Sequence, residues 1–333
     1  AGDTLPVSVF ENIADGTIPA GTTAYEKRGV AVKVPEWQAD NCIQCNNCAF
    51  VCPHAAIRPF LLTEEEAAAV PAGLKVQDGK AQFKAYKFAL SVSVLDCTGC
   101  GNCADVCPSK EKALVMKPLQ SQEAEQKNFD WLHAHIGYKD NVQPKTANIK
   151  NAQFAQPLFE FSGACAGCGE TPYIKTITQL FGDHMMIANA TGCSQAWGAP
   201  MPGIPYTTNK KGFGPAWTNS LFENNAELSL GMFLSVKQQR LAQKALVEAY
   251  ASSTGSEAAK NWLDSFDDFD LSRQTTDALI AELEEIIEEE LSKDIEEMNA
   301  ELIDDCCVAI ENLQSVLTGE ESKEYEAFLG VER

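Results

Sequence analysis

Two runs of cysteine have the spacing of iron–sulfur ligands. Each run reads C-x2-C-x2-C-x3-C-P: Cys42, Cys45, Cys48, Cys52 and Pro53 in the first, and Cys97, Cys100, Cys103, Cys107 and Pro108 in the second. Three closely spaced thiolates reach three irons of one cubane, and the fourth cysteine of the run ligates the other cluster. The pattern therefore predicts two [4Fe-4S] clusters that exchange their fourth ligands. We assign cluster 1 to Cys42, Cys45, Cys48 and Cys107, and cluster 2 to Cys97, Cys100, Cys103 and Cys52.

Zinc is the alternative for the same residues, because C-x2-C is also zinc spacing. A zinc site is complete with four ligands. It does not require a third cysteine at the same x2 spacing or a fourth cysteine directly before proline, and both features occur in each of the two runs. Pro53 and Pro108 restrict φ directly after the last ligand of each run. Small or polar residues between the ligands let backbone N–H groups approach the sulfurs, which tunes a cluster's potential. The repeated pattern favours electron-transfer clusters.

A third group of cysteines lies further along the chain. Cys165 and Cys168 form a C-x2-C pair in a glycine-rich segment, directly before a predicted helix over residues 171–181 with proline near its start. Cys193 follows a predicted buried strand over residues 185–189, and open α/β sheets place ligands at strand ends. Three cysteines are one fewer than a [4Fe-4S] cluster usually has. A third cluster, a zinc site and structural thiols all remain open on these residues alone.

Two further groups of metal-ligand residues have a simpler interpretation. Cys306 and Cys307 lie on an amphipathic helical pattern, where cysteine is most often a small hydrophobic core residue. His133 and His135 lie in a polar segment, where we expect packing or exposure rather than metal binding. The apolar positions of the amphipathic pattern are Leu279, Leu283, Ile286, Ile287, Leu291, Met298, Leu302, Ile303, Ile310 and Leu313.

The 44 residues from Pro53 to Asp96 exceed what a simple connection between two cluster motifs needs. A helix is predicted over residues 63–69, with Thr63 as its N-cap and Glu66 completing a capping box. Residues 88–95 alternate apolar and small polar side chains, which predicts a strand. The Asp-Gly pair in residues 77–80 indicates a hairpin turn. We expect this insert to dock the ferredoxin unit onto something larger.

The charge of the chain is concentrated near its C-terminal end. The formal net charge of the 333 residues is −21, and residues 255–333 hold 24 Asp and Glu against 5 Lys and Arg. This balance argues against nucleic acid and anionic membranes as partners, because both require clustered Lys and Arg. No apolar run of 18 residues and no secretory signal is visible. The 13 cysteines, odd in number and bunched, indicate metal binding in an oxygen-poor cytoplasm.

These patterns predict two domains joined by a linker. Residues 1–120 are expected to form an α+β bacterial-type two-[4Fe-4S] ferredoxin domain with an N-terminal arm and an inserted hairpin. Residues 121–155 are the expected linker. Residues 156–333 are expected to form an α/β domain, with acidic amphipathic helices over 255–315. Because residue 1 is not Met, the chain is also compatible with a start inside a longer polypeptide.

The whole chain resembles an interior-to-C-terminal segment of pyruvate:ferredoxin (flavodoxin) oxidoreductase, a thiamine-diphosphate enzyme of anaerobic metabolism. The resemblance includes the first cysteine run with its flanks, CIQCNNCAFVCPHAAIR at residues 42–58, and GACAGCGETPY at residues 163–173. The other matching stretches are 5–8, 21–29, 188–194, 206–209 and 214–227. The resemblance implies that residues 156–333 are the first part of the thiamine-diphosphate domain.

The resemblance also implies roles for the third group of cysteines. Cys165, Cys168 and Cys193 would be three ligands of a proximal [4Fe-4S] cluster, with the fourth ligand outside this chain. Glu170 and Cys193 match positions that contact thiamine diphosphate, although Glu170 could also be a first-turn acid placed for the helix dipole. The Gly-Asp-Gly signature that holds Mg²⁺ and diphosphate in the family has no match after Cys193. We therefore expect the thiamine site to be completed by residues outside the chain.

The implied activity is oxidative decarboxylation of pyruvate with coenzyme A to acetyl-CoA and CO2. This segment would carry electrons from thiamine diphosphate through three [4Fe-4S] clusters to an external ferredoxin or flavodoxin. The implied partners are the remaining domains of the same enzyme and a second copy in a homodimer. Two alternatives stay open: a freestanding ferredoxin-like electron carrier with a docking domain, and the electron-transfer part of another 2-oxoacid:ferredoxin oxidoreductase.

Overall fold

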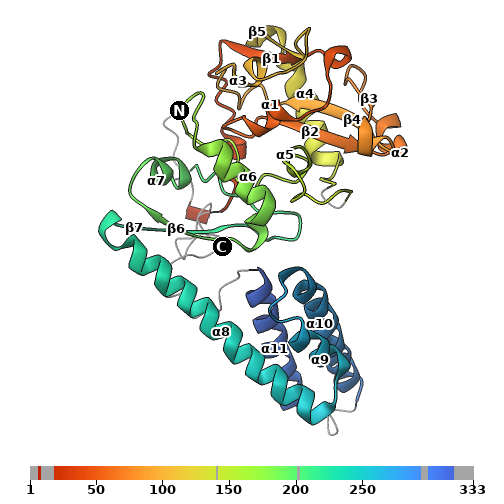
Figure 1. The fold of residues 1–333 in the computed structure, drawn as a ribbon, viewed down its shortest axis with the longest axis vertical. Coiled ribbons are helices and arrows are strands. Elements are labelled where there is room, and N and C mark those ends of the chain that lie inside the picture. The colour runs from red at the N-terminus through yellow and green to blue at the C-terminus, as the bar shows by residue number, and fades with distance from the viewer. Residues whose placement is uncertain (1–6, 9–18, 140–141, 201–202, 294–298, 319–333) are drawn as a thin grey trace. The chain divides into compact units, whose positions relative to one another are not determined.

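The computed structural model describes residues 7–8, 19–139, 142–200, 203–293 and 299–318 (Figure 1). The described residues form two compact units. The first unit comprises the residues up to Met185 together with Thr191–Pro215, and the second comprises Met186–Ala190 together with the residues from Ala216 onward. Met298 of the amphipathic pattern and residues 5–6 of the family resemblance lie outside the described residues.

The cysteine-rich part of the first unit has two similar halves. Strand β1 (Lys33–Trp37) pairs antiparallel with β5 (Leu114–Pro118). Each cysteine run contains a one-turn helix, α1 (Asn47–Phe50) in the first run and α3 (Asn102–Asp105) in the second. Both turns are preceded by a residue with positive φ, Asn46 at 62° and Gly101 at 83°, which reverses the chain directly before the turn. These repeated turns place the third cysteine of each run near the start of a helix.

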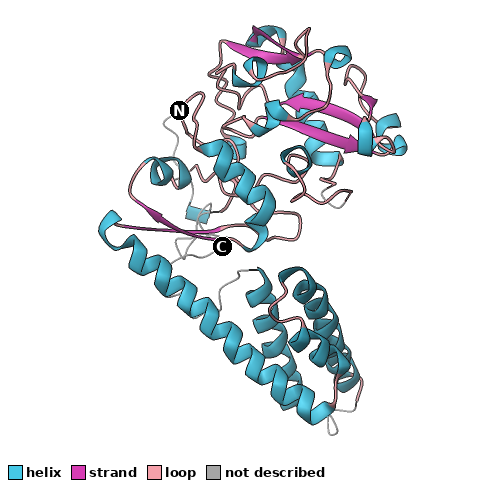
Figure 2. Ribbon diagram, viewed as in Figure 1, coloured by secondary structure: helices cyan, strands magenta, loops and turns pink. Residues whose placement is uncertain are grey.

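The insert between the cysteine runs forms a three-stranded antiparallel sheet (Figure 2). Its order is β2 (Ile57–Leu62), β4 (Lys87–Val92) and β3 (Gln77–Asp78). The predicted strand over 88–95 is present as β4 but ends at Val92, and Asp78 lies in β3 rather than in a tight turn. The connection from β3 to β4 runs through a 3-10 turn at Ala81–Phe83.

The predicted capping box is confirmed at the start of α2 (Glu64–Ala68). The Thr63 hydroxyl accepts a hydrogen bond from the Glu66 N–H at 3.2 Å, and the Glu66 carboxylate accepts one from the Thr63 N–H at 2.7 Å. Two donors at the helix start are thereby satisfied by local side chains.

The expected linker segment is ordered against this sheet. Helix α4 (Glu123–His135) packs on β4, and α5 (Ile149–Ala152) follows it. Leu132 of α4 is buried with Phe60 and Leu62 of β2. His133 and His135 stack on Phe129 and Trp131, with ring centroids 6.2 and 4.8 Å apart. The domain and linker boundaries expected from the sequence, 1–120, 121–155 and 156–333, stay a prediction.

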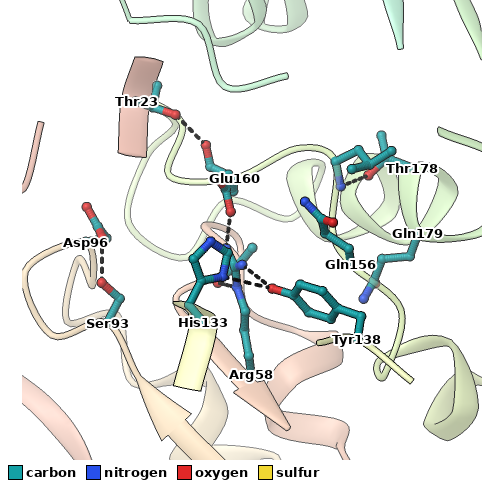
Figure 3. Close-up of polar contacts among 12 residues, drawn as sticks. Thr23, Arg58, Ser93, Asp96, His133, Tyr138, Gln156, Glu160, Thr178 and Gln179 are labelled. Atoms are coloured by element: carbon teal, nitrogen blue, oxygen red, sulfur yellow. Dashed lines mark hydrogen bonds and ion pairs between the residues drawn. The ribbon is translucent and has the colours of Figure 1, made fainter. Parts of the chain in front are cut away.

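A buried ion pair joins β2 to the segment that follows the linker (Figure 3). The Arg58 guanidinium pairs with the Glu160 carboxylate and donates to the Tyr138 hydroxyl at 2.7 Å. The guanidinium also lies over the ring of Phe161, 5.0 Å from its centroid. The Glu160 carbonyl accepts a hydrogen bond from the Thr23 hydroxyl at 2.9 Å. Segments from four parts of the sequence are thereby held at one point.

The predicted helix over 171–181 is confirmed as α6 (Thr171–Phe181), with proline in its first turn. In the same unit, α7 (Cys193–Gly198) begins at the third cysteine of the third group. Short 3-10 turns lie at Thr22–Tyr25, Ala39–Asn41, Leu119–Ser121, Gly182–His184 and Phe222–Asn224.

The second unit combines a small parallel sheet with helices. Strand β6 (Met186–Ala190) pairs with β7 (Ala216–Ser220), and the helices are α8 (Asn225–Thr254), α9 (Glu257–Asp264), α10 (Phe269–Leu291) and α11 (Ala300–Thr318). As predicted, Leu279, Leu283 and Cys306 are buried in one apolar core. The same prediction is wrong for Cys307, which is exposed. No helix among the described residues is long and apolar enough to cross a membrane.

Removal of one partner of the buried ion pair tests its importance. Glu160→Ala leaves the Arg58 guanidinium buried without its counterion, so we expect the free energy of unfolding to fall by about 3–5 kcal/mol. Chemical denaturation followed by circular dichroism measures this loss. The control is Asp78→Ala, which removes one of two exposed carboxylate partners of Lys87 and should cost much less. Equal losses in the two variants would contradict a special role for the buried pair.

Candidate iron–sulfur centres

The four cysteines assigned to cluster 1 line one cavity. Cys42, Cys45 and Cys48 come from the first run, and Cys107 comes from the second. The remaining wall is mainly apolar and is formed by Ile43, Asn46, Phe88, Leu90, Ala113 and Leu114. The fold therefore places one thiol of the second run in the same cavity as three thiols of the first run.

A second cavity shows the reciprocal exchange. Cys97, Cys100 and Cys103 of the second run line it together with Cys52 of the first. Its other lining residues include Pro35, Pro53, His54, Ile57, Val92 and Met116. The two sets of four cysteines are the sets assigned from the sequence, and their roles as iron ligands stay a prediction.

The contact between α1 and α3 explains this exchange of cysteines. Cys48 lies in the first turn of α1 and Cys103 in the first turn of α3. Each run continues past its one-turn helix to a fourth cysteine two residues beyond it, Cys52 or Cys107. Because the two short helices lie against each other, the fourth cysteine of one run reaches the cavity of the other.

The arrangement of the cysteines around the two cavities is compatible with a polynuclear cluster. Among the residues that the structure describes, no three His, Cys, Asp or Glu side chains converge closely enough to hold one metal ion. The cysteines instead surround cavities, and a cubane meets its four thiolates at four separate irons. A closed tetrahedral zinc site requires the four ligands to meet at one point.

Burial makes these thiols poor ligands unless positive charge accompanies them. Burial raises the pKa of Cys97 to about 12, and the neighbouring thiols Cys52 and Cys100 add to the rise. Burial and neighbouring thiols likewise raise the pKa values of Cys48 and Cys103. Since metal ligation requires thiolate, the cavities are suited to a group whose iron charge offsets the four thiolates.

Backbone amides point at three of the sulfurs. The N–H groups of Gln44, Gly99 and Ala113 donate to the sulfurs of Cys42, Cys97 and Cys107 at 3.4, 3.4 and 3.3 Å. Gly99 has φ of +72°, and a side chain there would place Cβ 2.8 Å from the Lys33 carbonyl oxygen. Glycine is therefore required for this close approach.

The indole of Trp37 is a further donor beside cluster 1. Trp37 is buried, and its Nε1 has no partner within the described residues. Burial raises the pKa of the Cys42 thiol, and the adjacent indole N–H opposes this rise because it favours the thiolate. Sequence reasoning missed Trp37, because its only signal is that it lies five residues before the first cysteine.

The third group of cysteines is more open. Cys165 and Cys193 are exposed, and Cys168 is half-buried. Partial burial of Cys168 raises its pKa, but the N–H groups of Thr171 and Glu170 outweigh this effect, so the pKa of the thiol is lowered. Cys193 begins α7. Glu170 is the exposed N-cap residue of α6.

The third group contacts the second cysteine run through its loop. His54 Nε2 donates to the Ala164 carbonyl at 2.9 Å, while its Nδ1 accepts from the Thr98 hydroxyl at 3.4 Å. Burial raises the pKa of Cys100, and a hydrogen bond from the Gly167 N–H to its sulfur opposes that rise. The loop between Cys165 and Cys168 therefore lies against the cluster 2 cavity. His54 was not singled out from the sequence, where it only follows the proline of the first run.

Comparison with known proteins agrees with these observations. Residues 35–108 match a protein-family model described as a 4Fe-4S dicluster domain, and residues 1–31 match one described as a domain of unknown function. The chain therefore contains a ferredoxin-like 4Fe-4S dicluster domain.

Curated relatives confirm the resemblance found in the sequence. The pyruvate-flavodoxin oxidoreductase of Enterobacter agglomerans is 62% identical over 71% of this chain and 20% of its own length. The pyruvate:ferredoxin oxidoreductase of Moorella thermoacetica is 54% identical over 84% of this chain and 24% of its own length. The pyruvate dehydrogenase [NADP(+)] of Cryptosporidium parvum is 52% identical over 72% of this chain and 12% of its own length. The chain thus spans a quarter or less of these relatives.

Exchange of the fourth ligands can be tested by removing Cys107. Although Cys107 belongs to the second run, Cys107→Ala should remove cluster 1, because its thiol lines that cavity. Anaerobic iron and sulfide analysis should show a loss of about four irons per chain. Cys307→Ala, which removes an exposed thiol outside both cavities, should retain all the iron. Full iron content in Cys107→Ala would contradict the assignment.

The Trp37 indole should raise the reduction potential of cluster 1. Trp37→Phe keeps the aromatic ring but removes the N–H beside Cys42, so reduction should become harder by on the order of tens of millivolts. A redox titration followed by EPR measures the shift. Trp131→Phe is the control, because Trp131 packs on the α4 side of the insert sheet. Equal potentials in Trp37→Phe and the parent chain would show that the indole has no influence.

Proposed function

We propose that this chain is a segment of pyruvate:ferredoxin (flavodoxin) oxidoreductase that carries electrons between thiamine diphosphate and an external carrier. The observation that carries the proposal is the pair of cavities lined by exchanged sets of four cysteines, found within a dicluster domain. Relatives with 52–62% identity are named as pyruvate oxidoreductases or a pyruvate dehydrogenase. These names favour this function over the freestanding carrier and over another 2-oxoacid as substrate.

In this proposal the cavities hold the two ferredoxin-type [4Fe-4S] clusters. Cluster 1 takes Cys42, Cys45, Cys48 and Cys107, and cluster 2 takes Cys97, Cys100, Cys103 and Cys52. The protein supplies thiolates, N–H donors to sulfur and an apolar wall, which together set the potentials.

A third [4Fe-4S] cluster is proposed at Cys165, Cys168 and Cys193, with its fourth ligand outside this chain. The lowered pKa of Cys168 supports a thiolate at that position. The contacts of His54 with Ala164 and of Gly167 with Cys100 support electron passage from this group to cluster 2. Glu170 and Cys193 are the proposed contacts of thiamine diphosphate, and its Mg²⁺ site would be completed elsewhere.

The proposed overall reaction converts pyruvate and coenzyme A to acetyl-CoA and CO2 and releases two electrons and one proton. Thiamine diphosphate supplies the decarboxylation chemistry when bound. The residues of this chain hold the clusters, orient the loop of the third cysteine group and set the potentials at which electrons pass singly to ferredoxin or flavodoxin.

The proposed partners, location and domain boundaries follow from the same function. The segment would work with the remaining domains of the enzyme, in a cytoplasmic homodimer. Residues 1–120 would form the ferredoxin-type domain, 121–155 the connection, and 156–333 the first part of the thiamine-diphosphate domain.

Removal of Cys193 from the full enzyme tests the third cluster. Cys193→Ala should leave about eight irons bound by this segment, which is two cubanes, but should abolish acetyl-CoA formation. Cys307→Ala is the matched control and should retain turnover. Unchanged turnover in Cys193→Ala would contradict the proposed proximal cluster. In the isolated 333-residue chain, we expect cluster reduction by a chemical reductant but no turnover of pyruvate.

A further inference from the structure

We propose that Lys175 is a built-in countercharge for clusters 1 and 2 and that it raises the reduction potentials of both. This inference rests on the proposed function, because it requires clusters in the two cysteine-lined cavities. Lys175 belongs to α6, the helix that begins directly after the third cysteine group.

The burial of Lys175 reflects an unusual orientation of α6. The buried face of this helix is polar and consists of Thr171, Lys175, Thr178 and Gln179. Three of its apolar residues, Tyr173, Ile177 and Phe181, are exposed within the described chain, while Ile174 and Leu180 are half-buried. A helix usually buries its apolar face. Lys175 is only 2% exposed, so its charge lies inside the first unit.

The ammonium group of Lys175 lies at the end of α1. Its Nζ donates to the carbonyl oxygens of Ala49 and Phe50, the latter at 3.0 Å. Ala49 directly follows Cys48, a proposed ligand of cluster 1, and Phe50 precedes Cys52, a proposed ligand of cluster 2, by two residues. The ammonium group is therefore bound by the two carbonyls that lie in the sequence between a proposed ligand of cluster 1 and a proposed ligand of cluster 2.

Protein carboxylates do not account for this buried cation. Within the described part of the chain, no carboxylate lies at ion-pair distance from Lys175, and its hydrogen-bond acceptors are two neutral carbonyls. The nearby Arg58 has Glu160 as its own partner. A buried ammonium without an anion is strongly disfavoured.

The negative charge that stabilises Lys175 comes from the cluster side. Burial lowers the pKa of Lys175 to about 8, and charges on Cys52 and Cys48 oppose that fall. A cubane with four thiolates carries net negative charge, so bound clusters would place negative charge near the ammonium group. Reduction adds one negative charge to a cluster, and attraction to Lys175 in this buried setting stabilises the reduced form. Both potentials should therefore be higher than without the lysine.

Midpoint potentials test this role in the full 333-residue chain, reconstituted anaerobically with iron and sulfide. Lys175→Met removes the charge and keeps a similar length, whereas Lys175→Arg keeps the charge. Lys117→Met makes the same charge change at an exposed position on β5. In redox titrations followed by EPR, Lys175→Met should shift both potentials to more negative values. Lys175→Arg should stay close to the parent, and Lys117→Met should shift far less than Lys175→Met.

The possible failures can be distinguished. A parent chain that binds no cubane would overturn the proposed function itself. If Lys175→Met binds cubanes whose potentials equal those of the parent chain, the countercharge role alone is overturned. The same holds if Lys117→Met shifts the potentials as much as Lys175→Met does. If Lys175→Met does not assemble clusters, Lys175→Gln provides the same test with an N–H donor retained. Assembly in Lys175→Arg but in neither neutral variant would support the role, because charge would then be the property that assembly requires.

Discussion

The first unit is organised around the cost of placing many thiolates where water is scarce. Burial raises the pKa values of Cys48, Cys97 and Cys103, so an isolated thiolate at these positions is strongly disfavoured. Iron offsets this cost most directly. The surrounding protein also stabilises the thiolates, by smaller amounts, through backbone N–H groups, the Trp37 indole and, as proposed, Lys175. Much of the local structure, including the glycine at residue 99, brings such donors close to sulfur.

The contacts that hold the third cysteine group follow from a separate anchor. Arg58 and Glu160 fix the chain shortly before the glycine-rich loop, with Tyr138 and Thr23 as further partners. From this anchor, Phe161 donates its N–H to the His54 carbonyl at 2.9 Å. The position of the loop against cluster 2 therefore depends on a buried polar network as well as on apolar packing.

The parts of the fold that depend on interactions between residues close in the sequence could be predicted from the sequence. The capping box at Thr63 and Glu66, the helix over 171–181 and the burial of Leu279 and Leu283 depend on short-range patterns. The two cysteine sets that line the cavities were also predicted, because the spacing of each run limits where its thiols can reach.

The orientation of α6 could not be predicted in the same way. Its apolar residues at 173, 177 and 181 indicate the opposite buried face, and only the tertiary environment of α1 explains why Lys175 lies inside. Trp37 and His54 were missed for a related reason, since each matters through a neighbour that is distant in the sequence. The short strand β3 also depends on pairing with β4 rather than on its own residues.

The exchange of fourth cysteines has a mechanical consequence for the insert. With the proposed clusters bound, Cys52 would be tied to the run that begins at Cys97, so the intervening polypeptide would become a closed loop. Cys107 would be tied back to the first run in the same manner. Each cluster would then act as a cross-link that reduces the conformational entropy of the unfolded chain, as a disulfide does. Oxidative loss of either cluster would therefore release chain segments that the other cluster alone does not restrain.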